Sequence, residues 1–467
     1  MSVHSIVIKS SLALLVTCSF LVGCKKEAPT TASPIAPPTT TTLTPPQYGT
    51  PFAGVPSRED AVIYQVNMRA FSASGNFAGV TARLDSIKEL GVNVLYLMPI
   101  HPVGQLRGVN SPYAVRDYRA VNPEFGTFTD LRTLVDAAHA RGLSVMLDWV
   151  ANHTAWDNAW ITTHPDWYLQ NAAGTILSPP NTPYTDVAQL NFNSAAVRLE
   201  MISAMKSWVF TANVDGFRYD YADAVPTTFW QQATDTLRRI QSHKLLLLAE
   251  GNRSANYASG VDYNFGFSFY DALKSVYRSG GPATNLNALN SSEYVGATGT
   301  QHVVRYTTNH DVNGSDGTPV ALFGGHAGAM SAFVIASLLK GIPMVYNGQE
   351  AGMTTAIPFP FTSVKINWAA HPDVTRTYKQ LLAARAGSPA LRRGTPTLYS
   401  TADVCAFTKT AGTDQALVLV NVRSTPTTYI LPAALANSTW TNALQAGTLT
   451  LGTQVVLPAY GYTILKK

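Results

Sequence analysis

Acidic side chains recur in this sequence at points where short apolar segments end. Arg218 and Asp220 lie two positions apart in GFRYD at 216–220, so they share one face if this segment is a strand. Glu250 ends the run LLLLAE, and Asp311 lies just beyond the run VVRYTTN. An isolated Arg-x-Asp pair is most simply a salt bridge at a strand end. Carboxylates at several strand ends are harder to explain in that way and instead favour a functional site.

Further polar residues follow other apolar segments. Asp148 lies near the end of LSVMLDWV, and Asn152 and His153 come directly after that run. His310 immediately precedes Asp311. Any one of these residues alone would be read as a helix cap or a surface ion pair. If the segments are parallel strands of a barrel, their carboxyl ends face one mouth, and the side chains gather there.

Strand-like apolar runs alternate with amphipathic periodic segments, as a barrel of alternating strands and helices requires. Periodic segments lie at 80–91, 128–142 and 195–210. This alternation predicts a (β/α)8 TIM barrel over residues 58–388. The eight predicted strands are 61–67, 92–99, 143–150, 214–220, 245–250, 261–265, 303–309 and 342–348.

Two segments depart from this alternation. Residues 151–195 form a predicted excursion after the third strand, a short domain B. Its aromatic residues could stack on sugar rings or could equally pack an irregular loop. Residues 389–467 contain short strand-like runs with turns and predict a C-terminal antiparallel β-sandwich domain, in which Cys405 is a buried small hydrophobe. The aromatic residues of the excursion are Trp156, Trp160, Trp167, Tyr168 and Tyr184.

The amino-terminal segment has the composition of an export signal. Residues 1–23 contain the basic Lys9 and an apolar stretch followed by small residues. The ending LVGC at 21–24 resembles the lipobox of bacterial lipoproteins, which implies cleavage before Cys24 and its lipidation; the alternative is a plain signal peptide with a chance Cys. Residues 24–57 are rich in Pro and Thr and predict a linker from the lipidated Cys. We therefore expect an exported, membrane-anchored lipoprotein at the periplasmic face, the outer membrane or the cell surface.

The composition is that of a folded, aromatic-rich protein. Of the 467 residues, 46% are hydrophobic, 10% are aromatic and only 13% are charged. The net charge of +5 includes Lys9, Lys25 and Lys26 of the leader and linker, so the folded part is close to neutral. No basic patch indicates a nucleic-acid partner.

Four of the polar motifs resemble, in the same order, the signature regions of the α-amylase family, glycoside hydrolase family 13. They are DWVANH at 148–153, GFRYD at 216–220, the AE that ends at Glu250 and NHD at 309–311. The resemblance implies a (β/α)8 barrel, a C-terminal β-domain and a retaining glycosidase. Weaker matches lie at 91–99, 111–118, 189–192 and 341–350.

The resemblance also implies roles for the acidic residues. Asp220 is similar to the family's nucleophile, Glu250 to its general acid/base, and Asp311 to the carboxylate that binds sugar hydroxyls and stabilises the transition state. We expect Arg218 to lower the pKa of Asp220, and neighbouring carboxylates to raise that of Glu250. Asp148 is expected to support Arg218 and the strand ends.

Binding roles are implied for four further residues. Tyr113 resembles the family's stacking tyrosine, and His153 and His310 resemble histidines that bind sugar hydroxyls at the cleavage point. Asn152 matches a position that in many α-amylases helps to bind a structural calcium ion.

The sequence departs from the family pattern at two places. Asp223 and Ala224 stand where many α-amylases have a Lys-His pair, which puts sugar binding on the leaving-group side in doubt. Gln189 stands where an acidic calcium ligand is expected, and its amide supplies no charge for a hard cation.

The main hypothesis is hydrolysis of α-1,4-glucosidic bonds in starch or maltooligosaccharides through a covalent glycosyl-enzyme intermediate. One alternative is a transglycosylase or a cyclomaltodextrin- or maltodextrin-preferring enzyme of the same family. Another is a non-catalytic glycan-binding lipoprotein that keeps the barrel as a scaffold. A metal hydrolase is less well supported, since no HExxH or comparable ligand spacing occurs.

Overall fold

The computed structural model describes residues 45–467 of the chain. The expected signal peptide at 1–23, Cys24 and most of the expected linker lie outside the described residues. Between Pro45 and Lys467, none of the helices combines the length and hydrophobicity that a membrane span needs.

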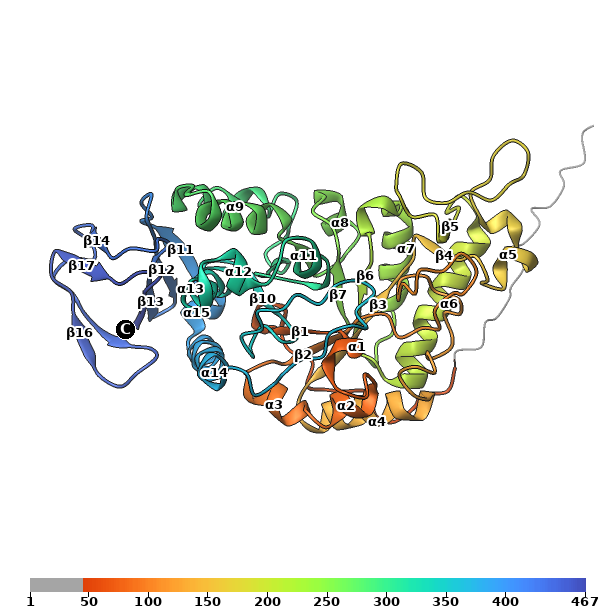
Figure 1. The fold of residues 1–467 in the computed structure, drawn as a ribbon, viewed down its shortest axis with the longest axis horizontal. Helices are drawn as coiled ribbons and strands as arrows, with labels where there is room; N and C mark the ends of the chain where they lie inside the picture. The colour runs from red at the N-terminus through yellow and green to blue at the C-terminus, as the bar shows by residue number, and fades with distance from the viewer. Residues whose placement is uncertain (1–44) are drawn as a thin grey trace, which may run out of the picture. The chain divides into compact units, whose positions relative to one another are not determined.

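Eight parallel strands close into a barrel in the order β1-β10-β9-β8-β7-β6-β3-β2 (Figure 1). The strands are short and their residues are almost entirely buried, as expected of strands that are covered by side chains inside the barrel and by helices outside. Each predicted strand coincides with one of them, which confirms the predicted barrel. The strands are β1 Ile63–Val66, β2 Val94–Leu97, β3 Ser144–Trp149, β6 Gly216–Tyr219, β7 Leu246–Ala249, β8 Tyr263–Phe265, β9 His302–Arg305 and β10 Ile342–Tyr346.

Helices surround the barrel, and two of the three predicted periodic segments are single helices, α4 and α6. The segment at 80–91 is instead divided between α2 and α3, because the backbone leaves helical geometry at Arg83, whose guanidinium lies 4.1 Å from the ring of Trp368. The helices outside domain B are α1 Met68–Phe71, α2 Phe77–Thr81, α3 Leu84–Glu89, α4 Phe128–Ala140, α6 Ala195–Ala212, α7 Thr227–Arg238, α8 Ser254–Ala258, α9 Phe267–Arg278, α10 Leu289–Ser292, α11 His310–Ser315, α12 Pro319–Leu322, α13 Gly325–Leu338, α14 Pro372–Ala386 and α15 Pro389–Arg393.

The excursion between β3 and α6 contains a two-stranded antiparallel sheet, β4 His153–Ala155 with β5 Val187–Gln189, and the short helix α5 Trp160–Thr163. The sequence allows two roles for the aromatic residues of this excursion, stacking on sugar rings and packing of the loop. Their burial in the structure distinguishes the two. Trp156, Trp167 and Tyr168 are buried in the protein core, and Trp160 packs partly buried against it. Tyr184 is 53% exposed. Packing therefore accounts for four of the five, and only Tyr184 is free to meet a ligand.

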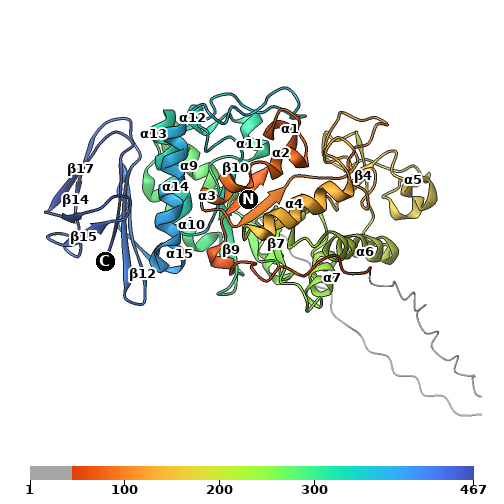
Figure 2. The ribbon, with the colours of Figure 1, turned by 90° about the horizontal axis from the view of Figure 1, so that it is seen from below.

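The C-terminal strands form a six-stranded antiparallel sheet and a two-stranded sheet. Along β12, Cys405 and Phe407 pack into the core shared with the barrel, whereas Val404 and Ala406 pack with the smaller sheet, so this central strand is buried on both faces. Cys405 is buried and free, as predicted. Figure 2 shows α13, α14 and α15 beside these strands. The strands are β11 Thr395–Leu398, β12 Val404–Ala411, β13 Asp414–Asn421, β14 Thr427–Ile430, β15 Thr439–Asn442, β16 Thr448–Thr450, β17 Gln454–Leu457 and β18 Tyr462–Lys466.

Residues 45–57, which composition assigns to the linker, lie against the barrel. The Tyr48 amide donates to the Phe210 carbonyl at 2.7 Å, and the Phe52 ring stacks on His139 with centroids 4.3 Å apart. Aromatic side chains thus fix this segment, although Pro and Thr dominate the composition before it. The folded unit therefore begins earlier than residue 58.

Candidate active site

Arg218 lies at the centre of a buried ion network at the carboxyl ends of β3, β6 and β7. Its Nη1 atom lies 2.7 Å from Asp148 Oδ1 and 2.7 Å from Asp220 Oδ1, and its Nη2 atom lies 2.7 Å from Glu250 Oε1. The Arg218 side chain is only 1% exposed, so water screens these contacts little. One guanidinium therefore holds three of the predicted carboxylates together.

The barrel ladder fixes the positions of these side chains. Asp148 and Arg218 are register partners on β3 and β6. The Asp220 amide donates to Trp149 O at 3.0 Å, and the Glu250 amide donates to Tyr219 O at 2.9 Å, so parallel pairing continues to both carboxylates. At the start of β6, a Cβ atom on Gly216 would lie 2.0 Å from a neighbouring strand's carbonyl oxygen. This glycine lets β6 approach β7 closely enough to align the site.

Burial dominates the titration of the two central carboxyls. It raises the pKa of Asp220 to about 7, although the Arg218 charge acts in the opposite direction. Burial also raises the pKa of Glu250 to about 8; Arg218 opposes this rise, and the charges of Asp220 and Asp311 add to it. Arg218 lowers the pKa of Asp220, as expected, but the loss of hydration outweighs the ion pair and the pKa rises overall. The charges of Asp220 and Asp311 thus raise the pKa of Glu250, as expected.

Tyr113 and His310 form a stacked pair beside this network, with ring centroids 5.3 Å apart. Gln65 Nε2 lies 2.8 Å from His310 Nδ1, and because an amide nitrogen only donates, Nδ1 accepts and Nε2 carries the proton. That nitrogen lies 2.6 Å from the Tyr113 hydroxyl, which in turn lies 3.0 Å from Asp148 Oδ2. Burial lowers the pKa of His310, which favours the neutral ring.

Asp311 is the most accessible of the carboxylates. Its side chain is 57% exposed, and its Oδ1 atom lies 3.3 Å from His310 Nε2. Asn309 caps α11 by accepting hydrogen bonds from the amides of Asp311 and Val312 at 3.0 and 2.9 Å. The cap holds the Asp311 backbone while its carboxylate remains free to bind a ligand.

His153 is held from both sides of its ring. Its Nε2 atom lies 3.2 Å from the Tyr113 carbonyl oxygen, and its Nδ1 atom lies 3.2 Å from Asn152 Nδ2. The carbonyl can only accept and the amide can only donate, so the proton is on Nε2. Burial lowers the pKa of His153 to about 4, so the ring is neutral.

These residues surround a cleft with a volume of about 580 Å³. The predicted site residues that line it are Tyr113, His153, Asp220, Glu250, His310 and Asp311. Arg218 and Asp148 lie behind them and contact the cleft residues from below. The predicted site residues thus form one connected group, which Asn152 joins through His153. Asn152 lines a second hollow instead.

The structure adds residues that motif reasoning missed. The Tyr221 amide donates to Glu250 Oε2 at 2.7 Å, and the residue adopts a left-handed φ of 45°. Tyr96 donates from its hydroxyl to Asp148 Oδ2 at 2.6 Å. Gln65 and Tyr96 lie inside apolar strand runs, where nothing distinguishes them from core residues. Tyr221 directly follows the predicted nucleophile, so its position in the chain was a usable signal.

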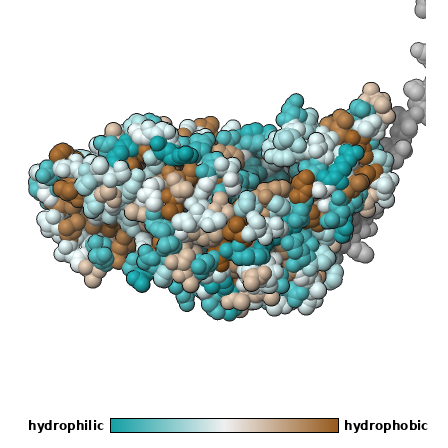
Figure 3. Space-filling view, in the orientation of Figure 1, coloured by the Kyte–Doolittle hydropathy of each residue, from teal (hydrophilic) through white to brown (hydrophobic). Residues whose placement is uncertain are grey.

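Exposed aromatic rings gather at the cleft. Among residues 45–467, the aromatic side chains with large exposure are Tyr184 at 53%, Tyr221 at 41% and Phe359 at 52%. All three line the cleft. The face of the described residues drawn in Figure 3 otherwise shows hydrophobic residues in small patches among hydrophilic ones. Aromatic faces beside carboxylates suit a ring with apolar C–H faces and many hydroxyls.

Asp223, at the first departure from the family pattern, braces the loop that follows Glu250. Its carboxylate accepts from Arg253 Nε at 3.0 Å, from Asn256 Nδ2 at 2.8 Å and from the Asn252 amide at 3.0 Å. Gly251 is required beneath it, because a Cβ atom there would lie 2.1 Å from Asp223 Oδ1. Asp223 thus supports the loop after Glu250 from a position that also borders the cleft.

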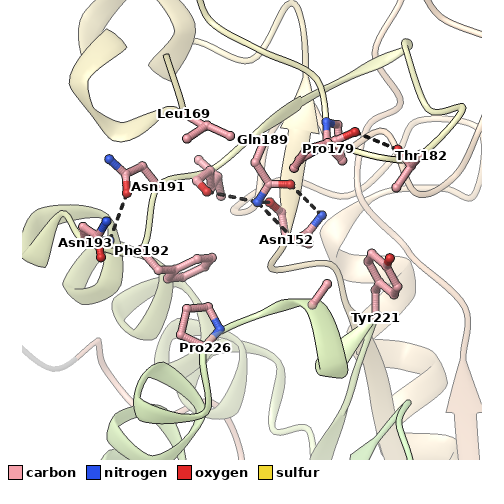
Figure 4. Close-up of a pocket in the computed structure, with 13 residues that line it drawn as sticks. Asn152, Leu169, Pro179, Thr182, Gln189, Asn191, Phe192, Asn193, Tyr221 and Pro226 are labelled. Atoms are coloured by element: carbon pink, nitrogen blue, oxygen red, sulfur yellow. Dashed lines mark hydrogen bonds between the residues drawn. The ribbon is translucent and has the colours of Figure 1, made fainter. Parts of the chain in front are cut away.

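The residues around Asn152 do not fit the calcium ion that the family resemblance implies. Asn152 and Gln189 bond to each other through their amides, as Figure 4 shows. The hollow beside them, of about 270 Å³, is lined by uncharged residues. Within residues 45–467, no group of three or more His, Cys, Asp or Glu side chains is arranged to hold a metal ion. A hard cation would find no carboxylate ligand here.

Comparison with known proteins agrees with this geometry. The sequence model of the alpha-amylase catalytic domain matches residues 48–186 and 180–412. Alpha-amylase MalA of Haloarcula japonica is 28% identical over 408 residues, which cover 80% of this chain and 57% of the relative. An alpha-1,4-glucan:maltose-1-phosphate maltosyltransferase of Cereibacter sphaeroides is 30% identical over 315 residues, 61% of this chain and 50% of the relative. The chain thus spans about half the length of these curated relatives.

A solved structure extends the likeness to the whole architecture. The alpha-amylase of Lactobacillus plantarum superposes with a TM-score of 0.79 at 27% identity, and the match covers 88% of this chain and 99% of that one. The family match spans the barrel, domain B and the start of the C-terminal sheet. The chain therefore belongs to the alpha-amylase family of glycoside hydrolases.

Proposed function

We propose that this protein hydrolyses α-1,4-glucosidic bonds in starch or maltooligosaccharides with retention of configuration. The arrangement of Asp220 and Glu250 on neighbouring nitrogens of the Arg218 guanidinium carries the proposal. Retaining glycosidases need two closely spaced carboxyl groups, whereas inverting enzymes leave room for a water between them. Carboxylates held by one guanidinium suit the closer spacing.

In the first step, an ionised Asp220 oxygen attacks the anomeric carbon while the bond from that carbon to the leaving oxygen breaks. Glu250 donates its proton to the leaving oxygen, and the sugar becomes an ester of Asp220. In the second step, Glu250 takes a proton from water, the water oxygen bonds to the anomeric carbon, and Asp220 is released. Glu250 ends protonated, ready for another cycle. The raised pKa of Glu250 supports its role as the proton donor.

The remaining cleft residues bind the sugar at the cleavage point. Asp311 accepts hydrogen bonds from hydroxyls on the ring that develops positive charge, and His153 and His310 contact further hydroxyls. The ring of Tyr113 supplies a face for stacking. Arg218 and Asp148 act from beneath, since Arg218 fixes both central carboxylates and Asp148 fixes Arg218.

Product analysis tests the proposal. We expect the purified protein to release reducing sugars from starch and maltooligosaccharides, and proton NMR to show the α-anomer as the first product. First formation of the β-anomer would refute the retaining mechanism. Absence of turnover on starch, pullulan, cyclodextrin, maltooligosaccharides and sucrose would refute the proposed activity altogether.

A second candidate is transfer of the glycosyl group to a sugar acceptor. The uncharged hollow of Figure 4 shares Thr182 and Tyr221 with the cleft, so it offers space next to the cleft for an acceptor. The maltosyltransferase among the relatives supports the same candidate. Mass spectrometry of products formed from maltoheptaose with excess labelled maltose distinguishes the two, because transfer puts label into longer chains and hydrolysis does not.

We also propose that the chain is exported and anchored through a lipid on Cys24. The supporting observation is the LVGC sequence at 21–24 after an apolar leader. Labelled palmitate should enter the wild-type protein but not C24S, and the wild type should fractionate with membranes. Release of an unlabelled wild-type protein into the soluble fraction would refute the anchor.

A further inference from the structure

We infer that the Gln189 side chain takes the place of a structural cation at the base of domain B and fixes His153 without a metal. Three oxygen atoms surround the Gln189 amide nitrogen. Nε2 lies 3.0 Å from the main-chain oxygen of Asn152, 3.1 Å from Asn152 Oδ1 and 3.0 Å from the main-chain oxygen of Leu190 (Figure 4). Oxygens converging on one point are the environment that a hard cation takes.

The orientation of the amide is fixed by its neighbours. The oxygens of Asn152 and Leu190 on the main chain can only accept hydrogen bonds, so the group that faces them is the NH2 of Gln189. In the reverse direction, Asn152 Nδ2 donates to Gln189 Oε1 at 3.0 Å. The two side chains therefore form a reciprocal amide pair, and the position between the oxygens is filled by N–H donors.

Strand pairing places this amide pair where two parts of the protein meet. His153 and Gln189 are register partners on β4 and β5, and the Leu190 amide donates to the Asn152 main-chain oxygen at 3.1 Å. Asn152 follows barrel strand β3, whereas Gln189 lies at the far end of the domain B excursion. The amide pair consequently joins the end of the excursion to the barrel mouth.

The uncharged residues around the amide pair argue against a metal ion at this position. The residues that line the adjoining hollow are polar amides, prolines and apolar or hydroxyl side chains. A divalent cation there would have to displace the Gln189 NH2 and would gain no carboxylate. The two N–H groups of the neutral amide face the same oxygens with no charge to bury.

The pair also reaches the catalytic cleft. Asn152 Nδ2, which binds Gln189 Oε1, lies 3.2 Å from His153 Nδ1 and sets the tautomer whose Nε2–H points to the Tyr113 carbonyl. Gln189 is thus a positioning residue that acts on His153 through Asn152. This last link rests on the proposed function, because it assumes that His153 binds sugar.

Thermal unfolding with and without Ca²⁺ tests the inference. We expect the wild-type protein to have the same Tm in EDTA as in millimolar Ca²⁺. Q189E replaces the donor with a carboxylate that faces three oxygens, so its Tm in EDTA should fall by about 3 °C or more. Ca²⁺ should restore much of that loss, since the new carboxylate completes a cation site. Q231E, on the exposed face of α7, is the matched control and should show neither effect.

A second variant keeps the test decisive. Q189A should lose stability in EDTA and should not regain it with Ca²⁺, because it supplies neither donor nor carboxylate; the outcome holds even if Q189E folds poorly. A rise in wild-type Tm with Ca²⁺ that is absent in Q189A would overturn the inference, as would wild-type stability in Q189A.

A selective rise in KM for Q189A, with kcat little changed, would support the link to His153. An inactive wild type would count against the proposed function alone, since the unfolding results do not depend on turnover.

Discussion

Asp215 and Asp220 lie at opposite ends of the same strand, β6, and both are buried aspartates whose pKa is raised by burial. At the amino end, Asp215 Oδ2 lies 2.7 Å from His139 Nε2 and 2.7 Å from the Val145 amide. At the carboxyl end, Asp220 pairs with Arg218 and borders the cleft. Burial and a charged or hydrogen-bonding partner are therefore common to both residues.

The difference lies in what each carboxylate can reach. Asp215 is enclosed between β6, β3 and α4, where its partners are parts of the fold. Asp220 opens onto a space that can hold a sugar, and Glu250 and Asp311 border the same space. A raised pKa alone thus marks burial, and only access to a cleft turns the residue into a catalytic candidate. Position at the carboxyl end of the strand decides that access.

The largest expected effect is the loss of catalysis on substitution of Asp220, at the carboxyl end of β6. D220N removes the attacking oxygen but keeps the shape of the side chain, so kcat on maltoheptaose should fall at least about 10³-fold. Its Tm at neutral pH should not fall, because the variant no longer buries a carboxylate. Stopped assays and calorimetry on one preparation provide both numbers. Turnover within tenfold of the wild type would show that Asp220 is not the nucleophile.

A pH profile sharpens the comparison within the cleft. Activity needs Asp220 ionised and Glu250 protonated, so kcat/KM should rise as pH approaches about 7 and fall above about 8. Each unit beyond a limb should cost about tenfold. Limbs near pH 4 would show that burial does not govern these carboxyls in solution.

The pH dependence of stability should follow the protonation of the same two carboxyls, Asp220 and Glu250. Both pKa values are raised in the folded state, so the stability linked to their protonation is fully present below pH 4 and is lost as pH rises through about 7 and 8. D220N should therefore gain Tm relative to the wild type as pH rises from about 4 to about 7, and should keep that gain at higher pH. A wild type that became more stable over this range relative to D220N would contradict the sign.

A substitution at the amino end of β6 should lower stability and leave catalysis nearly unchanged. D215A removes the acceptor of the Val145 amide and of His139, and leaving buried donors unpaired costs about 1–3 kcal/mol. We expect Tm to fall by several degrees and kcat to stay within twofold of the wild type at a temperature where the variant is folded. A hundredfold loss of kcat in the folded variant would break the distinction between the two ends.

The smallest expected effect concerns Tyr221. Y221A keeps the amide that binds Glu250 and loses the exposed ring, whose stacking on a sugar would be worth about 0.5–1.5 kcal/mol. We expect kcat/KM for maltoheptaose to fall by about twofold to tenfold, and Y221F to behave like the wild type. An unchanged value in Y221A would show that the ring does not contact substrate.

The barrel was predictable because its strands are buried on both sides and therefore appear as uninterrupted apolar runs. Strands β11 and β16 of the C-terminal domain are short and Thr-rich, and none of their residues is fully buried, so they do not appear as apolar runs. The split of the segment at 80–91 was equally hidden. Its apolar spacing continues past Arg83, where the backbone leaves helical geometry.

The motifs predicted which residues gather at the mouth, since each follows a strand of known order. The pKa values and hydrogen-bonding roles of these residues were harder to predict. The raised pKa of Asp220 depends on how deeply the fold buries it, which spacing does not reveal. Gln189 looked like a weak metal ligand because its role depends on which way its amide faces, and only the carbonyl oxygens of Asn152 and Leu190 determine that.

Trapping the covalent intermediate tests the central claim most directly. In E250Q, Asp220 should still attack 5-fluoro-α-glucosyl fluoride, because the fluoride leaving group needs no proton. The variant should hydrolyse the resulting ester slowly. Intact-mass and peptide mass spectrometry should then find one fluoroglucosyl group, attached to Asp220. Attachment to Asp311, or turnover of the reagent without any adduct and with an inverted product, would contradict the account.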